Sequence, residues 1–145
     1  MRRALLIKSA QDALGEPHTV QNAVYMWHRA NLWLAFVAAT TVGALGIGWL
    51  LDLGTTNTGV IAIGLAGIAS AASTRYFVLA RTGDTIALMT GSPIRRVAKT
   101  LVRADLTPDH ISPSGNTLLA TDWKIAGRVY TVPKSCDQDM QAMLV

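Results

Sequence analysis

The residues best suited to proton transfer lie in the stretch "ADLTPDHI", where Asp105, Asp109 and His110 fall within six residues. A carboxylate and an imidazole can form an acid–base pair when both reach the same reacting atom. Pro108 and Pro113, however, favour turns on both sides of this pair, which is typical of a solvated loop. We favour the solvated loop and predict no catalytic residue in the chain.

Residue types that bind metals or attack substrates are otherwise few and scattered. The three histidines, His18, His28 and His110, and the one cysteine, Cys136, have no partners at metal-ligand spacing. Cys136 precedes a predicted C-terminal helix, where a thiol can be activated, but such a cysteine is more often inert. The run "GALGIG" lies inside an apolar stretch and follows no predicted strand, so it is not a phosphate loop. The sequence therefore predicts a non-enzymatic protein with no metal and no cofactor.

A basic cluster is the more informative charged feature. Its members fall at spacings that share one side of a helix: Arg95, Arg96, Lys99 and Arg103. Anionic lipid headgroups attract basic residues near a membrane by about 1 kcal/mol each. Nucleic acid is not expected as a partner, because no aromatic residues interleave the cluster. We predict that these residues bind anionic lipids or a partner; a solvated face is the alternative.

The central third of the chain predicts membrane spans. Asp52 is the only charged residue from Asn31 to Thr74. Residues 32–51, "LWLAFVAATTVGALGIGWLL", would form a helix roughly 30 Å long, the thickness of a hydrocarbon core. Residues 52–58 then form a short loop, and residues 59–77 a second, less apolar span. The alternative for the first run is a buried helix of a globular protein, although no polar stripe marks such a helix here.

Small residues are expected to let the two predicted spans approach closely. On the second span they recur at helical spacing, and Ala35, Ala39 and Gly43 offer a matching face on the first. The predicted helix-packing residues are Ala62, Ala66, Gly67 and Ser70. The same face could serve a homo-oligomer or a membrane protein partner.

The distribution of basic residues predicts the topology. All thirteen lie outside residues 32–74, and basic residues favour the cytoplasmic side of a membrane. We therefore expect a multi-pass protein of the inner (plasma) membrane with the 52–58 loop outside and both termini cytoplasmic. No secretory signal peptide is expected, because the basic N-terminus is far from the first apolar run.

Two flanking regions complete the predicted organisation. Residues 1–31 are expected to form amphipathic cytosolic helices over 2–14 and 19–31. Residues 78–145 are expected to form a cytosolic, β-rich α+β module. Strands are predicted over 75–80 and 85–90 around a Gly83-Asp84 turn. Residues 94–106 fit either a helix or a strand, and a closing helix is expected to be capped by Ser135.

Four stretches carry a resemblance to known proteins: "DALGEPHTVQNAV", "RYFVLARTGDTIALM", "LTPDHISPSGN" and "GRVYTVPKSCDQDM". Their order resembles that of uncharacterised actinobacterial two-span membrane proteins. The rhythm from Thr82 to Leu88 is similar to that of bacterial pleckstrin-homology-like (PH-like) domains. The resemblance implies a membrane hairpin joined to a small PH-like module, and it brings no known catalytic residues.

Together these features predict a non-enzymatic integral membrane protein. Its small cytosolic module would present a binding or scaffolding surface to protein partners or to membrane lipids. The alternative is a small pore-forming or membrane-perturbing protein of the holin or phage-exclusion kind, built on the same hairpin. The folded C-terminal module counts against that alternative.

Overall fold

The computed structural model describes residues 2–15, 18–29, 32–47 and 55–144. The chain forms two compact units. The first comprises Met1–His28 and Arg75–Val145, and the second is the intervening segment Arg29–Thr74. The N-terminal region therefore belongs to the same unit as the C-terminal β-rich region.

The first unit is built on one seven-stranded sheet with the order β4-β3-β2-β1-β7-β6-β5. The antiparallel pairings are β1 with β7, β2 with β3, β3 with β4, β5 with β6, and β6 with β7. The strands are β1 (Asn22–Arg29), β2 (Thr74–Thr82), β3 (Thr85–Gly91), β4 (Ala98–Leu106), β5 (Ile111–Asn116), β6 (Ala120–Ile125) and β7 (Arg128–Pro133). The helices are α1 (Arg2–Leu14), the 3-10 helices η2 (Pro108–His110) and η3 (Lys134–Cys136), and α5 (Asp137–Gln141).

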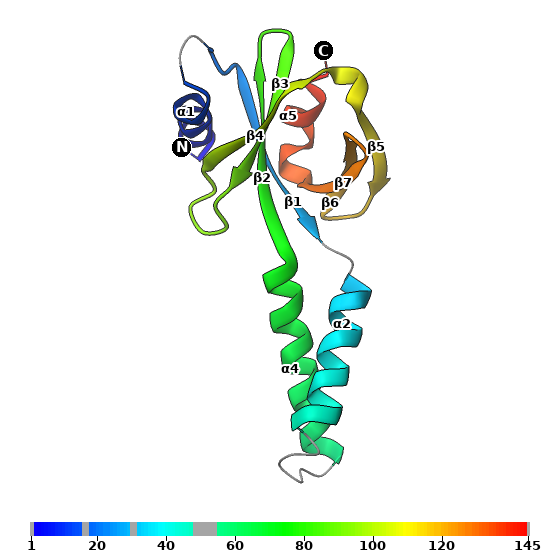
Figure 1. Ribbon diagram of the computed structural model, residues 1–145. Helices are drawn as coiled ribbons and strands as arrows, with labels where there is room; N and C mark the ends of the chain where they lie inside the picture. The colour runs from blue at the N-terminus through cyan, green and yellow to red at the C-terminus, as the bar shows by residue number, and fades with distance from the viewer. Residues whose placement is uncertain (1, 16–17, 30–31, 48–54, 145) are drawn as a thin grey trace. The chain divides into compact units, whose positions relative to one another are not determined.

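Both faces of the central strands are buried, and this explains their unbroken apolar sequences. Along β2, Phe77 and Leu79 enter one core cluster, while Val78 and Ala80 enter the other. The first cluster includes Met140 of α5, and the second is covered by α1, so the two helices lie on opposite sides of β2 (Figure 1). A strand covered on both faces needs no polar alternation. The predicted strands over 75–80 and 85–90 are confirmed.

β1 corrects the predicted helix over residues 19–31. The apolar spacing of Val20, Val24 and Trp27 fits a helical stripe, but the segment forms a strand. Within it, Ala23 and Tyr25 face the α1 side, whereas Val24 and Met26 face the α5 side. β1 lies between β2 and β7 in the middle of the sheet, and both of its faces are buried. Its sequence therefore lacks the alternation of apolar and polar residues that identifies a half-exposed strand.

β4 settles the ambiguous segment 94–106. Residues Ala98–Leu106 pair with β3 through a ladder with register shifts, so the segment is a strand and no helix forms. β4 ends the sheet, and its residues between Ala98 and Leu106 are exposed. An edge strand with a short apolar repeat resembles an amphipathic helix in sequence, which is why periodicity alone left both possibilities open.

The turn between β6 and β7 contains a strained residue. Ala126 has φ 48° and Gly127 has φ 84°, and they join Ile125 to Arg128, which are paired across the strands. A two-residue turn with two positive φ values favours Asn-Gly, because alanine pays a steric penalty there that asparagine tolerates better.

We expect Ala126→Asn to raise the free energy of unfolding of the full chain by about 1 kcal/mol, by relieving that penalty. Chemical denaturation followed by circular dichroism measures the change. Gly127→Ala is the opposing variant, because it places a second Cβ at positive φ, and it should destabilise the turn. Equal stabilities of both variants and the parent would contradict the assigned turn geometry.

The second unit is a helical hairpin. It comprises α2 (Leu32–Thr41), a π-helical segment η1 (Val42–Ile47) and α4 (Thr55–Ser73). The helices touch where side chains are smallest: a Cβ added to Gly43 would lie 3.0 Å from the Ala62 Cα. Ala39, Ala62 and Ala66 are buried in the described part of this contact. Small side chains thus let the two backbones approach closely.

The predicted transmembrane hairpin is wrong. Among the described residues, none of the helices combines the length and the apolar character needed to cross a membrane. The predicted fold class, membrane helices joined to a PH-like module, is replaced by a helical hairpin and an α+β unit with a seven-stranded sheet. The predicted multi-pass location in the inner membrane, with both termini cytoplasmic, rested on the two spans and falls with them.

The local structure explains the difference. α2 is α-helical over ten residues, and from Val42 the chain continues as the π-helical segment η1 rather than as a regular α-helix. The hydroxyls of Thr40 and Thr41 donate hydrogen bonds to the carbonyls of Phe36 and Val37 near its end, a pattern that bends helices. α4 opens with a polar turn, and β2 takes over at Thr74, so the predicted extension to residue 77 is strand. Residues 48–54 of the first predicted span and loop lie outside the described residues.

Candidate functional site

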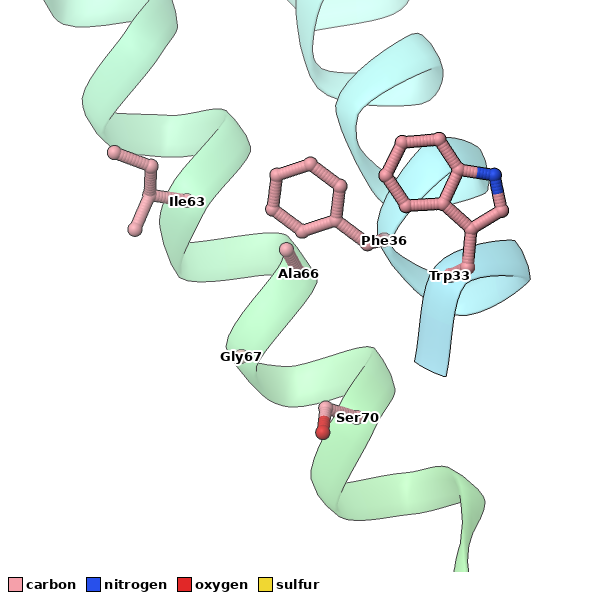
Figure 2. Close-up of a pocket in the computed structure, with 6 residues that line it drawn as sticks. All are labelled: Trp33, Phe36, Ile63, Ala66, Gly67 and Ser70. Atoms are coloured by element: carbon pink, nitrogen blue, oxygen red, sulfur yellow. The ribbon is translucent and has the colours of Figure 1, made fainter. Parts of the chain in front are cut away.

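The groove is an apolar hollow between α2 and α4, within the hairpin unit. It has a volume of about 600 Å³ and is lined by Trp33, Phe36, Ile63, Ala66, Gly67 and Ser70. Figure 2 shows the Phe36 ring reaching from α2 toward Ala66 on α4. The rings of Trp33 and Phe36 stack with their centroids 6.4 Å apart.

Large apolar side chains at the rim of the groove are exposed to solvent. The Trp33 and Ile63 side chains are 69% and 70% exposed. A Cβ added to Gly67 would meet no heavy atom within 4 Å. Residues 32–47 and 55–73 contain no charged side chain. The groove therefore presents bulky aromatic and aliphatic groups beside an open hollow, which is a surface suited to an uncharged apolar partner.

The structure divides the predicted helix-packing residues between two environments. Ala62 and Ala66 are buried, and Ala62 is the residue that Gly43 approaches. Gly67 and Ser70 line the groove, and so does Ala66, which therefore belongs to both environments. Sequence reasoning missed Trp33, Phe36 and Ile63 as lining residues. The three-residue spacing of Trp33 and Phe36 was the available signal, because it places both rings on one helical face.

The predicted basic cluster does not lie on a helix. Arg95 and Arg96 lie between β3 and β4, whereas Lys99 and Arg103 lie in β4, and all four are exposed. Arg103 forms a salt bridge with Asp105 at 2.8 Å. The prediction that the four residues act together toward anionic lipids assumed one helical side, and that geometry is replaced by a strand and a turn. Lipid binding by these residues stays a prediction.

Arg96 is engaged with an aromatic pair. Its guanidinium lies 5.6 Å from the centroid of the Tyr25 ring, and Tyr25 stacks on Tyr76 with centroids 5.7 Å apart. Burial, followed by the neighbouring Tyr76, raises the pKa of Tyr25 to about 12, against the lowering effect of Arg96. The phenol is therefore neutral at ordinary pH, so the contact is a cation–π interaction that uses Arg96 to cover a core residue.

The acidic and histidine residues of "ADLTPDHI" are not assembled for proton transfer. Asp105 accepts a hydrogen bond from Arg103, and this bond lowers the pKa of its carboxyl. His110 Nδ1 instead contacts, at 2.9 Å, the hydroxyl of Thr107, the N-cap of the short helix η2. Asp109 is exposed on the same helix. His110 also helps to lower the pKa of the Asp105 carboxyl, but the two side chains have different hydrogen-bond partners.

The C-terminal helix begins one residue later than predicted. η3 covers Lys134–Cys136, and α5 starts at Asp137 with Cys136 as its N-cap and no side-chain cap hydrogen bond, so the predicted Ser135 cap is wrong. Cys136 is half-buried against the core cluster that includes Met140. Across residues 2–15, 18–29, 32–47 and 55–144, no three His, Cys, Asp or Glu side chains gather as a metal site would require.

Comparison with known proteins identifies no relative: no family model, curated protein or solved structure matches this chain. The resemblance to an actinobacterial family therefore stays a prediction, whereas the membrane hairpin and the PH-like module that it implied are corrected above.

Proposed function

We propose that this chain is a non-enzymatic scaffolding protein that self-associates through the groove between α2 and α4. The observation that carries the proposal is the uncharged, exposed apolar surface formed by Trp33, Phe36 and Ile63 around the open position at Gly67. Contiguous exposed apolar surface of this kind marks interaction sites. Each chain in the assembly would then present its own β-sheet unit.

A second copy is the occupant that the surface chemistry favours. The described hairpin residues carry no charge, so a charged partner surface would lose its hydration without gaining an ion pair. A two-fold interface must be self-complementary. The hairpin supplies both halves of such a fit, because the protruding Trp33 and Ile63 side chains lie beside the hollow at Gly67.

Gly67→Leu tests the groove directly. A Cβ at this position meets no heavy atom within 4 Å, so we expect the fold to persist while the leucine side chain blocks the groove. We expect the full chain to form a defined dimer or small oligomer by sedimentation equilibrium. Gly67→Leu should weaken that association at least about tenfold, since overpacking a fitted contact costs about 1–3 kcal/mol.

Gly64→Leu is the matched control. Gly64 lies three residues away on α4, has the same open surroundings and does not line the groove. It should associate like the parent. A parent chain that is monomeric at every concentration would overturn the proposal. So would two leucine variants that behave alike, or a parent whose tryptophan fluorescence responds to lipid vesicles while the chain remains monomeric, which would make lipid the occupant.

A further inference from the structure

β4 is the last strand on one side of the sheet, and within the described residues no strand pairs with its outer edge. Every residue from Lys99 to Asp105 is exposed. α1 meets the beginning of the strand, where the Ala98 N–H donates a hydrogen bond to Ser9 Oγ at 3.0 Å. An edge strand presents a row of N–H and C=O groups with which another strand can pair. β4 therefore offers an accessible backbone edge beyond Ala98.

The strand at the opposite end of the sheet, β5, is less suited to pairing. It is six residues long and contains Pro113 and Gly115. Proline has no N–H to donate to a neighbouring strand, and glycine weakens a strand. β4 is nine residues long and contains neither residue type. Of the two edges of the sheet, the one formed by β4 is therefore better suited to accept a further strand.

The side chains of β4 combine exposed apolar surface with positive charge. Leu101 and Val102 are 41% and 54% exposed. Lys99 and Arg103 flank this pair in the strand. Arg103 forms a salt bridge with Asp105, but both side chains are largely exposed to solvent, so the pair is weak and can be exchanged for another. An incoming strand would thus meet two apolar and two basic side chains.

The charge balance decides which kind of strand fits. From Arg95 to Asp105 the chain carries four basic residues and one acidic residue, a net charge of +3. Basic residues on an edge deter pairing with strands of like charge, including a second copy of β4. Opposite charges that face each other stabilise adjacent strands. The same basic residues therefore disfavour one class of strand and select an acidic one.

We propose that β4 binds an extended acidic peptide segment of a partner protein, which joins the sheet as an additional strand. Backbone hydrogen bonds along the edge provide affinity in this mode of recognition, and side-chain contacts provide specificity. Carboxylates of the peptide pair with Lys99 and Arg103, and its apolar side chains cover Leu101 and Val102. An anionic lipid surface can neutralise the charges but cannot form a ladder with the backbone. The site lies in the β-sheet unit and is independent of self-association through the groove.

The probe is a seven-residue peptide of alternating glutamate and valine, blocked at both ends. It is titrated into the full-length ¹⁵N-labelled chain, and the backbone amides are followed by chemical shift and by hydrogen exchange. We expect saturable shifts in β4 together with slower exchange of β4 amides, because new hydrogen bonds protect them. The same peptide with lysine in place of glutamate should not bind. A form with proline at its centre keeps the charge but lacks one N–H, and it should bind more weakly.

A pair of lysine variants tests the position of the site. Lys99→Glu should weaken binding of the glutamate peptide about fivefold or more, because it reverses one charge pair across the edge. Lys124→Glu is the matched control, since Lys124 is also an exposed strand residue but lies in β6, which is paired on both sides. It should bind the peptide like the parent. Gly67→Leu should do so as well, which separates this test from that of the groove.

Four results would overturn the proposal. The first is the absence of saturable shifts in β4. The second is an equal loss of binding in the two lysine variants, and the third is a shift of β4 without slower exchange, since both indicate unspecific charge attraction. The fourth is another occupant of the edge. Protection of β4 that grows with protein concentration in the absence of peptide would identify a second copy. Binding to phosphatidylglycerol vesicles that Lys99→Glu abolishes, in a chain that ignores the peptide, would identify lipid.

Discussion

Leu79→Ala should lower the free energy of unfolding by about 3 kcal/mol, the largest effect that we expect from a single truncation in this chain. Leu79 lies in β2, one strand from the centre of the sheet, and is 0% exposed. Its side chain belongs to the core cluster that also holds Met26 and Met140. Truncation removes buried apolar surface and leaves a cavity, because a strand paired on both sides cannot move to close it.

The matched control is Leu118→Ala, which removes the same atoms from a side chain that is 97% exposed. It should change stability by less than about 0.5 kcal/mol. Guanidinium titrations followed by circular dichroism at strand wavelengths measure both variants. Similar losses for the two leucines would contradict the position assigned to β2 between two covered faces.

The second large effect is expected at the narrowest point of the hairpin. Gly43→Ala should destabilise the contact between α2 and α4 by about 1–3 kcal/mol. The added Cβ would lie 3.0 Å from the Ala62 Cα and 3.4 Å from the Ala62 nitrogen. These are backbone atoms, so relief requires the helices to separate. Amide hydrogen exchange of α4 measures the effect locally, because separation exposes the backbone of α4 to solvent.

Gly46→Ala, in the same π-helical segment, is expected to have the opposite sign. A Cβ there would meet no heavy atom within 4 Å, and alanine stabilises a helical position relative to glycine by about 0.5–1 kcal/mol. Amide exchange in α4 should therefore become faster with Gly43→Ala and be unchanged or slower with Gly46→Ala. Faster exchange in both variants would show that the segment, rather than the close approach, controls the hairpin.

Local signals in the sequence predicted some elements of the fold correctly. Gly83, at φ 59°, makes the turn that joins β2 to β3, and its Gly-Asp pair was recognisable. α1 was recognisable because its apolar positions, including the buried Leu6 and Ala10, follow helical spacing. Each of these features depends on a few neighbouring residues, so a pattern in the sequence can report it.

Elements that depend on distant parts of the chain were not predictable in this way. β1 resembles a helix in sequence because both of its faces are buried, one on the side of α1 and the other on the side of α5. Its partner strands β2 and β7 lie far along the chain, so no local pattern reveals this burial. The same double burial explains the apolar residues 77–80 of β2, which resembled the end of a membrane span. Small residues such as Ala62 and Gly43 predicted a close helix contact, but that signal is common to hairpins in and out of lipid.

The candidate sites show the same division. Gly67 and Ser70 were predicted as helix-packing residues from their spacing on one helix, and the structure places them in the lining of the groove. A cavity of about 440 Å³ in the β-sheet unit was not predicted, because its residues come from β5, β6 and the C-terminal segment and form no contiguous pattern. Only the tertiary structure shows that Trp123 and Asp137 share a cavity.

The position of the hairpin in the chain has a consequence for the order of folding. β1 and β2 are neighbours in the sheet, yet residues 30–73 separate them in sequence. Closing a flexible loop of that length costs about 3 kcal/mol more than closing a two-residue turn. If α2 and α4 pack against each other first, they bring the end of β1 close to the start of β2. The loop that must close when the two strands pair is then effectively shorter. The hairpin would then set the folding rate of the sheet, and a short turn in its place should make refolding of the sheet unit faster.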